Sequence, residues 1–220
     1  HARVRPVAAP DQTVGILGAM FSGANYTADE YLGVPFFSPT SEARISRGYT
    51  VYIGAEHTFT PDLSAQLNGG VQIYDYYNDP SSDTQVSPYV QGSMRYMYRA
   101  TSSLEAGVSL MRTPTDAYSP TLGGSYVLDA ESLVFYGAWV HEILPRLYSN
   151  VNGSFQQSKF NGGSLDGDSD YYYRVGLSLA YEFSKYVSAN VGYNWDQADS
   201  DDPSRAYNRN RVYLGVTAAY

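Results

Sequence analysis

The sequence predicts an all-β protein: a transmembrane, antiparallel, up-and-down β-barrel of about ten strands, with short periplasmic turns and longer outer loops. Three observations predict this fold. Apolar and polar residues alternate along most of the chain, short and long connections alternate between the segments that show this pattern, and 23 of the 220 residues are tyrosine. Tyrosine is enriched where a protein surface meets both lipid headgroups and water.

The closing stretch, residues 207–220, shows the alternation most clearly. Successive side chains of a strand point to opposite faces of the sheet. One face would then carry Val212, Leu214, Val216, Ala218 and Tyr220, and the other would carry Arg209, Arg211, Tyr213, Gly215 and Thr217. In a water-soluble sheet the apolar face needs a covering layer, whereas in a transmembrane barrel lipid covers it and the polar face lines the lumen. An aromatic-rich soluble β-sandwich is the alternative interpretation.

Taken in order, the chain begins with residues 1–12, which lack periodicity and are interpreted as an N-terminal tail. Residues 13–220 are assigned to the outer-membrane barrel. Residues 14–26 are predicted to form a strand, with a buried helix as the alternative that their three glycines disfavour. Regular alternation then predicts strands over residues 48–59, 63–76, 86–98, 104–110, 133–143, 147–159, 171–183, 187–196 and 207–220.

The connections between these strands also alternate. Tight turns are predicted near residues 61, 101, 145 and 185, about 40 residues apart, and long polar loops near residues 80, 122, 165 and 202. This is the asymmetry of outer-membrane barrels, which have short periplasmic turns and long outer loops. A sandwich with Greek-key connections has no reason to keep it. Most of the predicted strands have 11–14 residues, which exceeds the roughly 9–11 that cross a bilayer when tilted.

Composition excludes several classes of function. Cysteine is absent, so the chain has neither disulfides nor thiolate chemistry, and the formal charge of -8 without a basic cluster argues against a nucleic-acid partner. No apolar run is long enough for a transmembrane helix. No nucleophile, phosphate-loop or paired-cysteine motif is present. We therefore predict no catalytic, cofactor-binding or metal-binding residues.

Four segments of the second half resemble the putative β-barrel porin family of bacterial outer membranes. They are SLVFYGAWVHEILPRL (132–147), FNGGSLDGDSDYYYRVGLSLAYEF (160–183), SANVGYNWDQADSD (188–201) and YNRNRVYLGVTAAY (207–220). Residues 49–79 are similar to an earlier hairpin of the same family. The resemblance implies location in a bacterial outer membrane, where lipid is one partner. Members of the family are usually longer, so the strands could close as one barrel or form one section of a larger wall.

The last strand is also expected to carry the assembly signal that barrel-assembly machinery recognises during insertion. The residues assigned to this signal are Leu214, Val216, Ala218 and Tyr220. A homo-oligomer or a larger envelope complex is left open as a further partner.

Charged residues on the predicted inward faces are the candidate lumen lining. They are Glu56, Arg95, Glu105, Arg174, Glu182, Asp196, Arg209 and Arg211. Opposed charges inside a lumen can select ions. In a narrow barrel they can instead pair with one another and fill it.

Two other features of the sequence contain residue types that bind metals. His57 and His141 lack a histidine partner at ligand spacing. The run Asp166-Gly-Asp168-Ser-Asp170 resembles the start of a calcium loop, but the later glutamate is missing, so a solvated acidic loop is preferred.

The function predicted from these observations is a porin-like passive channel for ions or small solutes. A barrel with a filled lumen and a structural, adhesive or envelope-complex role is the alternative. An outer-membrane hydrolase, with active-site residues drawn from separate loops, is the third candidate.

Overall fold

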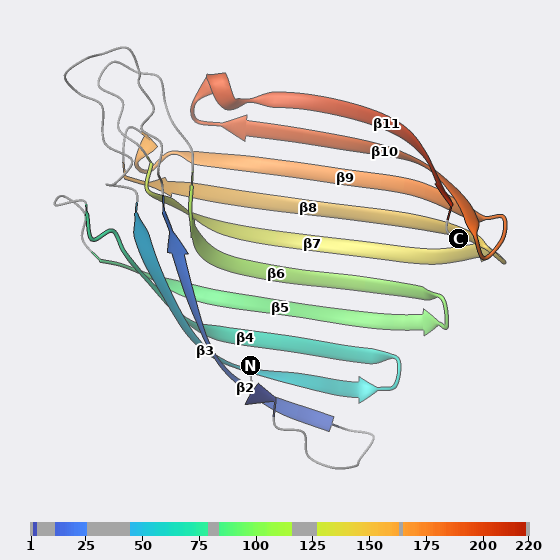
Figure 1. Ribbon diagram of the computed structural model, residues 1–220, viewed down its shortest axis with the longest axis horizontal. Coiled ribbons are helices and arrows are strands. Elements are labelled where there is room, and N and C mark those ends of the chain that lie inside the picture. The colour runs from blue at the N-terminus through green and yellow to red at the C-terminus, as the bar shows by residue number, and fades with distance from the viewer. Residues whose placement is uncertain are drawn as a thin grey trace.

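The computed structural model describes residues 2–3, 12–25, 45–78, 84–115, 127–162 and 165–218. These residues form a single antiparallel sheet whose strands follow the order of the sequence (Figure 1). The strands are β1 (Ala2–Arg3), β2 (Gln12–Ala24), β3 (Ser46–Thr60), β4 (Leu63–Asp75), β5 (Gln85–Arg99), β6 (Ser102–Pro114), β7 (Asp129–Leu144), β8 (Leu147–Asn161), β9 (Ser169–Glu182), β10 (Val187–Ser200) and β11 (Tyr207–Ala218). A 3-10 turn, η3 (Pro203–Arg205), precedes β11.

The prediction of ten antiparallel up-and-down strands is confirmed by β2–β11. The first predicted strand, over residues 14–26, corresponds to β2, which is a strand and not a helix and spans Gln12–Ala24. Strands also extend into two predicted loops. β6 continues to Pro114 and β7 begins at Asp129 on either side of the loop near residue 122, and β10 continues to Ser200 in the loop near residue 202. Within the predicted tail, Ala2 and Arg3 pair with Leu17 and Ile16.

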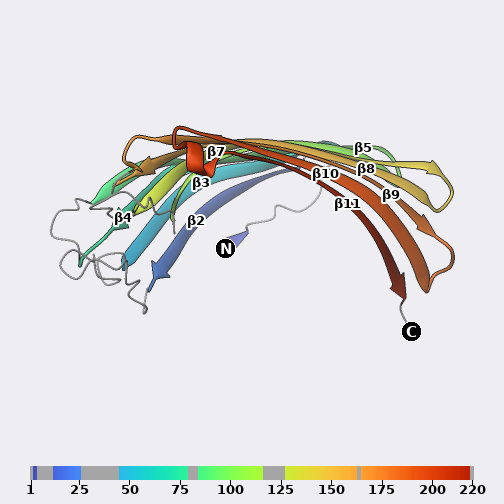
Figure 2. The same ribbon diagram turned by 90° about the horizontal axis from the view of Figure 1, so that it is seen from above.

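The sheet is arched and open (Figure 2). In the part of the chain that the structure describes, β11 pairs only with β10, and the opposite edge is formed by the two-residue strand β1 beside β2. Closure into a barrel is therefore not seen in the structure and stays a prediction. Among the same residues, no helix has the length and apolar character needed to cross a membrane.

The two faces of the arch differ as the alternating pattern predicts. The buried polar residues Thr50, Asn68 and Gln72 all belong to the polar set, so this is the crowded, concave face. The apolar set lies on the convex face and is uncovered, with Leu214 on β11 79 % exposed. Burial of apolar side chains is the main driving force for folding in water. A face of this kind therefore requires an apolar surrounding medium.

Aromatic rings gather on the convex face in two bands. The band beside the short turns contains ring pairs two residues apart on alternate strands: His57–Phe59, Tyr96–Tyr98, Trp139–His141 and Tyr181–Phe183. The band toward the long connections includes Phe21–Tyr49 and Phe155–Tyr173. On β9 the eight-residue step from Tyr173 to Tyr181 spans roughly 27 Å along the strand, or about 20 Å at a 40° tilt. This approaches the height of a lipid-facing apolar band between two aromatic girdles.

Four tyrosines of the concave face lie across glycines of the neighbouring strand. A Cβ atom built on any of these glycines would fall closer than 3.0 Å to the tyrosine side chain. Each pair consists of direct cross-strand neighbours: Tyr52–Gly18, Tyr74–Gly48, Tyr136–Gly107 and Tyr213–Gly192. The rings therefore lie along the wall instead of projecting from it.

Candidate functional site: the charged concave face

The register places all eight predicted lumen residues on the concave face. Glu56, Arg174, Asp196 and Arg209 belong to one row of cross-strand neighbours. The row passes between them through Gln66, Ser93, Gly107, Tyr136 and Ser154.

The other four predicted residues lie nearer the short turns. Arg95 and Glu105 are direct neighbours in the adjacent row, and the same row reaches Arg211 through Asn152, Gly176 and Asn194. Glu182 is the last residue of β9 and faces Ser188.

The β10–β11 hairpin gathers three of these residues into an ion cluster. The Asp196 Oδ2 atom lies 3.0 Å from Arg209 Nη2 and 3.3 Å from Arg211 Nη2. The Asp196 side chain is 10 % exposed, whereas the two arginine side chains are 52 % and 54 % exposed. One carboxylate thus orients two guanidiniums that remain open to solvent. Arg174 faces Asp196 from β9, so this part of the wall has a surplus of positive charge.

A hollow of about 220 Å³ lies on the other half of the concave face, where Glu56, Arg95 and Glu105 line it with Ser64 and Gln66. Two carboxylates and one guanidinium line this hollow. Among the eight predicted residues, the charge is therefore distributed unevenly, with an acidic surplus on β3–β6 and a basic surplus on β9–β11. The two halves of the face create a field directed across it.

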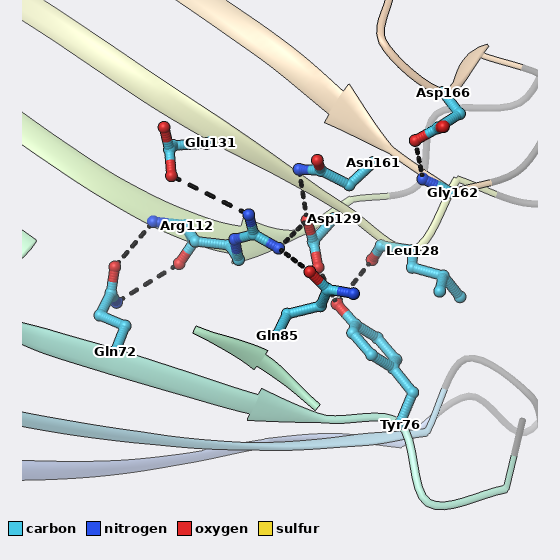
Figure 3. A network of polar contacts seen from close by, with 10 residues as sticks. All are labelled: Gln72, Tyr76, Gln85, Arg112, Leu128, Asp129, Glu131, Asn161, Gly162 and Asp166. Atoms are coloured by element: carbon cyan, nitrogen blue, oxygen red, sulfur yellow. Dashed lines mark hydrogen bonds and ion pairs between the residues drawn. The ribbon is translucent and has the colours of Figure 1, made fainter. Parts of the chain in front are cut away.

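A second buried network, at the long-connection end, was missed by the sequence analysis (Figure 3). Arg112 Nη1 lies 3.3 Å from Asp129 Oδ1, and Asp129 is fully buried. The Tyr76 hydroxyl shares its single proton between Asp129 Oδ2 at 2.8 Å and the Leu128 carbonyl oxygen at 3.1 Å. Asn161 Nδ2 donates to Asp129 Oδ1 at 2.9 Å. A buried charge is expensive unless it is paired and hydrogen-bonded. Both carboxylate oxygens of Asp129 have partners here.

A break between β5 and β6 explains why this network forms. Their pairing ends at Val90 and Leu110, so Pro88 and Arg112 would be neighbours if it continued. Met97 of β5 donates its N–H to the Asp62 carbonyl beside β4, so by alternation the even-numbered residues of β5 direct their N–H groups toward β6. Pro88 has no N–H to donate. The hydrogen bonds between β5 and β6 therefore end before Pro88, and β6 continues to pair with β7 alone.

Gln72 compensates for the missing neighbour. Arg112 donates its backbone N–H to Gln72 Oε1 at 2.7 Å, and Gln72 Nε2 donates to the Arg112 carbonyl oxygen at 3.4 Å. Arg112 is also an anomaly in the sequence, because its position continues the apolar set of β6. That anomaly was the available signal, but it had no interpretation without the break at Pro88.

A third network joins η3 to β9. Arg205 Nη2 lies 2.6 Å from Asp170 Oδ2, which also accepts the Tyr172 hydroxyl at 2.8 Å. The Arg205 guanidinium lies 4.8 Å from the centre of the Phe160 ring. Burial lowers the pKa of Arg205, but the hydrogen bond and the charge of Asp170 outweigh it and leave the pKa raised. This pair holds the η3 turn against the sheet.

The acidic run 166–170 and the two strand histidines have other contacts. Asp170 binds Arg205, and Asp166 accepts the backbone N–H of Gly162. His57 Nδ1 lies 2.7 Å from Thr13 Oγ1, and His141 stacks on Trp139. No group of three or more potential metal-ligating side chains is found among the described residues.

The residues assigned to the assembly signal lie at the end of β11. Leu214, Val216 and Ala218 alternate on its convex face and are exposed. Tyr220 lies outside the described residues.

Comparison with known proteins agrees with the resemblance in the second half of the chain. The family model described as Putative beta-barrel porin 2 matches residues 133–220, which confirms the resemblance for this C-terminal part. No curated protein matches the chain. Among solved structures, the chain is similar to a loop-deletion mutant of OmpT, an outer membrane protein of Vibrio cholerae, with 11 % identity and a TM-score of 0.47. That match covers 94 % of this chain, which spans 62 % of the OmpT chain. The fold and the family model together support an outer-membrane β-barrel.

Proposed function

We propose that this chain forms the wall of a bacterial outer-membrane β-barrel whose concave face lines a water-filled path for small solutes, with a preference for anions. The observation that carries the proposal is the placement of all eight charged lumen candidates on the concave face, opposite an uncovered apolar face. Lipid-facing and lumen-facing residues alternate in this way in transmembrane barrels.

The convex face supports location in a membrane. Apolar side chains between two aromatic bands suit a hydrocarbon layer with an interface on either side. The description of the matching family supports the bacterial outer membrane in particular.

The concave face supports a hydrated lumen. The tyrosine rings that lie across glycines leave space in front of the wall. Arg209 and Arg211 are half exposed although they share one carboxylate, so water reaches their guanidiniums. Arginine remains protonated at any ordinary pH. A hydrated surplus of fixed positive charge attracts anions.

The open edge of β11 bears on how the wall is completed. Its outer backbone N–H and C=O groups would lack partners in lipid, and each unsatisfied group costs several kcal/mol there. We therefore propose that β11 pairs with another strand in the membrane. That strand is either β2, at the opposite end of this sheet, or one from a longer wall.

The experiment is to refold the protein, insert it into planar bilayers and measure its reversal potential in a KCl gradient. We expect conductance with a modest anion preference. The double variant Arg209→Glu, Arg211→Glu should shift the preference toward cations, because it replaces two positive charges by two negative ones. Lys159→Glu is the control, because Lys159 is an exposed residue of the convex face.

Two results would contradict the proposal. Absence of conductance in inserted protein would favour a structural role in the envelope. Unchanged selectivity of the double variant would remove the arginines from the permeation path.

A further inference from the structure

A hollow of about 320 Å³ lies on the concave face at the long-connection end, over β6–β9. Its lining includes Thr113 of β6, Ser132 of β7, and Gln156 and Ser158 of β8. Tyr172 and Arg174 of β9 complete the polar part of the wall. The volume is at the lower end of the range for small-molecule sites, so it suits a ligand about the size of one sugar ring.

One positive charge of the hollow, that of Arg174, is not paired with a carboxylate among the described residues. Arg205 also borders the space, but its charge is paired with Asp170. Arg174 has no carboxylate within 4.0 Å among the residues that the structure describes, and its guanidinium lies 5.9 Å from the centre of the Tyr172 ring. An arginine in this position can form a charge-assisted hydrogen bond with a planar carboxylate.

The neutral polar groups of the hollow are arranged as a chain of hydrogen bonds. Gln156 Nε2 donates to Ser158 Oγ at 2.8 Å, and the hydroxyl oxygens of Ser158 and Ser132 are 2.8 Å apart. If the Ser158 hydroxyl donates its hydrogen bond to Ser132 Oγ, the Ser132 hydroxyl can donate to a ligand. The rings of Tyr172 and Phe160 add apolar surface to the same lining. Hydroxyl and amide groups beside aromatic rings match the alternating O–H and C–H surfaces of a sugar.

From this combination we infer that the hollow is a binding subsite for a small polyhydroxylated carboxylate, such as a uronic acid. The inference rests on the proposed channel function and names the class of solute that the channel would favour. Arg174 recognises the carboxylate, and the Ser132–Ser158–Gln156 chain recognises the hydroxyl groups.

The position of Arg174 links the subsite to the rest of the charged face. Arg174 is the direct cross-strand neighbour of Asp196, which binds both Arg209 and Arg211. A carboxylate that leaves Arg174 therefore reaches the guanidiniums of Arg209 and Arg211 on β11. Closely spaced sites of moderate affinity allow a solute both to enter and to leave.

The test is calorimetric titration of the refolded, detergent-solubilised protein with glucuronate, glucose and acetate. Glucuronate carries both the charge and the hydroxyl groups, glucose lacks the charge, and acetate lacks the hydroxyl groups. We expect glucuronate to bind with clearly higher affinity than either. Arg174→Gln should weaken glucuronate binding about tenfold or more, and Ser132→Ala should weaken it by a smaller factor.

Lys159→Gln is the matched control, because it also removes one positive charge but Lys159 is an exposed residue of the convex face. It should leave glucuronate binding unchanged, and circular dichroism establishes that each variant is folded. Equal affinity for glucose would overturn the role of Arg174, and equal affinity for acetate would overturn the role of the hydroxyl groups. Absence of glucuronate binding by a protein that conducts KCl would overturn the subsite and leave the channel intact. Binding without conductance would support the subsite and contradict the channel.

Discussion

The side-chain amide of Gln72 takes the place of a β-strand beside Arg112. It accepts the Arg112 N–H and donates to the Arg112 carbonyl oxygen, as the backbone of a neighbouring strand would. The strand that should stand there, β5, carries Pro88 at the corresponding position and has no N–H to offer. Gln72 is itself buried and lies one strand further away, on β4. A side chain thereby repairs a break in the wall caused by a proline.

Replacement of Gln72 should therefore destabilise the protein. In Gln72→Ala the backbone N–H and C=O of Arg112 lose both partners, and we expect the free energy of unfolding to fall by about 1–3 kcal/mol. Denaturant titration in detergent, followed by circular dichroism, measures the change. Gln66→Ala is the control, because Gln66 lies on the same face of the same strand, in the hollow lined by Glu56 and Glu105. Equal stability of the two variants would show that the repair contributes nothing.

The Tyr76 hydroxyl makes the same region sensitive to alkali. Burial, followed by the negative charge and hydrogen bond of Asp129, raises the pKa of Tyr76 well above its ordinary value. The pKa of Tyr76 in the folded protein exceeds its unfolded value of about 10. The protonated Tyr76 hydroxyl therefore stabilises the fold fully below pH 10, and this stabilisation declines as the pH rises above 10.

Tyr76→Phe isolates that contribution from the other tyrosines. The variant should be less stable at pH 8, because Asp129 loses a hydrogen bond, but its stability should fall less steeply between pH 10 and 12. Denaturant titrations of both proteins at several pH values provide the comparison. Parallel pH profiles would exclude Tyr76 as the titrating group.

Two adjacent residues of β9 test the assignment of the faces. Leu177 belongs to the exposed convex set, and Ser178 belongs to the concave set. Leu177→Arg places a charge near the middle of the lipid-facing band, where it should cost about 2–4 kcal/mol. Ser178→Arg, at the same depth, should cost much less. Refolding yield into lipid vesicles and denaturant titration measure both, and equal costs would contradict the assignment.

The contact between Tyr136 and Gly107 tests whether flat rings keep the lumen open. A Cβ at Gly107 would overlap the Tyr136 ring, so Gly107→Ala should displace the ring toward the lumen at a cost of about 1–3 kcal/mol. We expect lower single-channel conductance, restored by the added change Tyr136→Ala. Gly137→Ala is the control, because its Cβ would meet no atom closer than 3.6 Å. Unchanged conductance of Gly107→Ala would mean that the ring does not border the path.

The strands were predictable because each one shows the alternation of apolar and polar residues in its own sequence. Val175, Leu177 and Leu179 of β9 alternate with Arg174, Gly176 and Ser178, and no neighbouring strand is needed to interpret them. The shared face of the charged residues followed from the same period. The grouping of the charged residues into rows did not follow from this period. The row from Arg174 through Asp196 to Arg209 depends on the register between strands.

The Arg112–Asp129 network could not be predicted for a related reason. The alternation of apolar and polar residues weakens near both residues, so the sequence predicts a long loop near residue 122. Arg112 is buried only because β5 and β6 separate after Val90 and Leu110. Neither the break nor its repair by Gln72 has a local sequence pattern, since they involve three different strands.

The strand order has a consequence for the route by which the wall forms. Each of β2–β10 is hydrogen-bonded to the next strand in the sequence, so the sheet can grow hairpin by hairpin through contacts that are short along the chain. Closure of β11 onto β2 would be different in kind, because it joins opposite ends of the described sheet and requires a loop through nearly the whole chain. Assembly would then consist of many fast local steps and one slow closing step, with the exposed edge of β11 as the surface that must be protected until closure occurs.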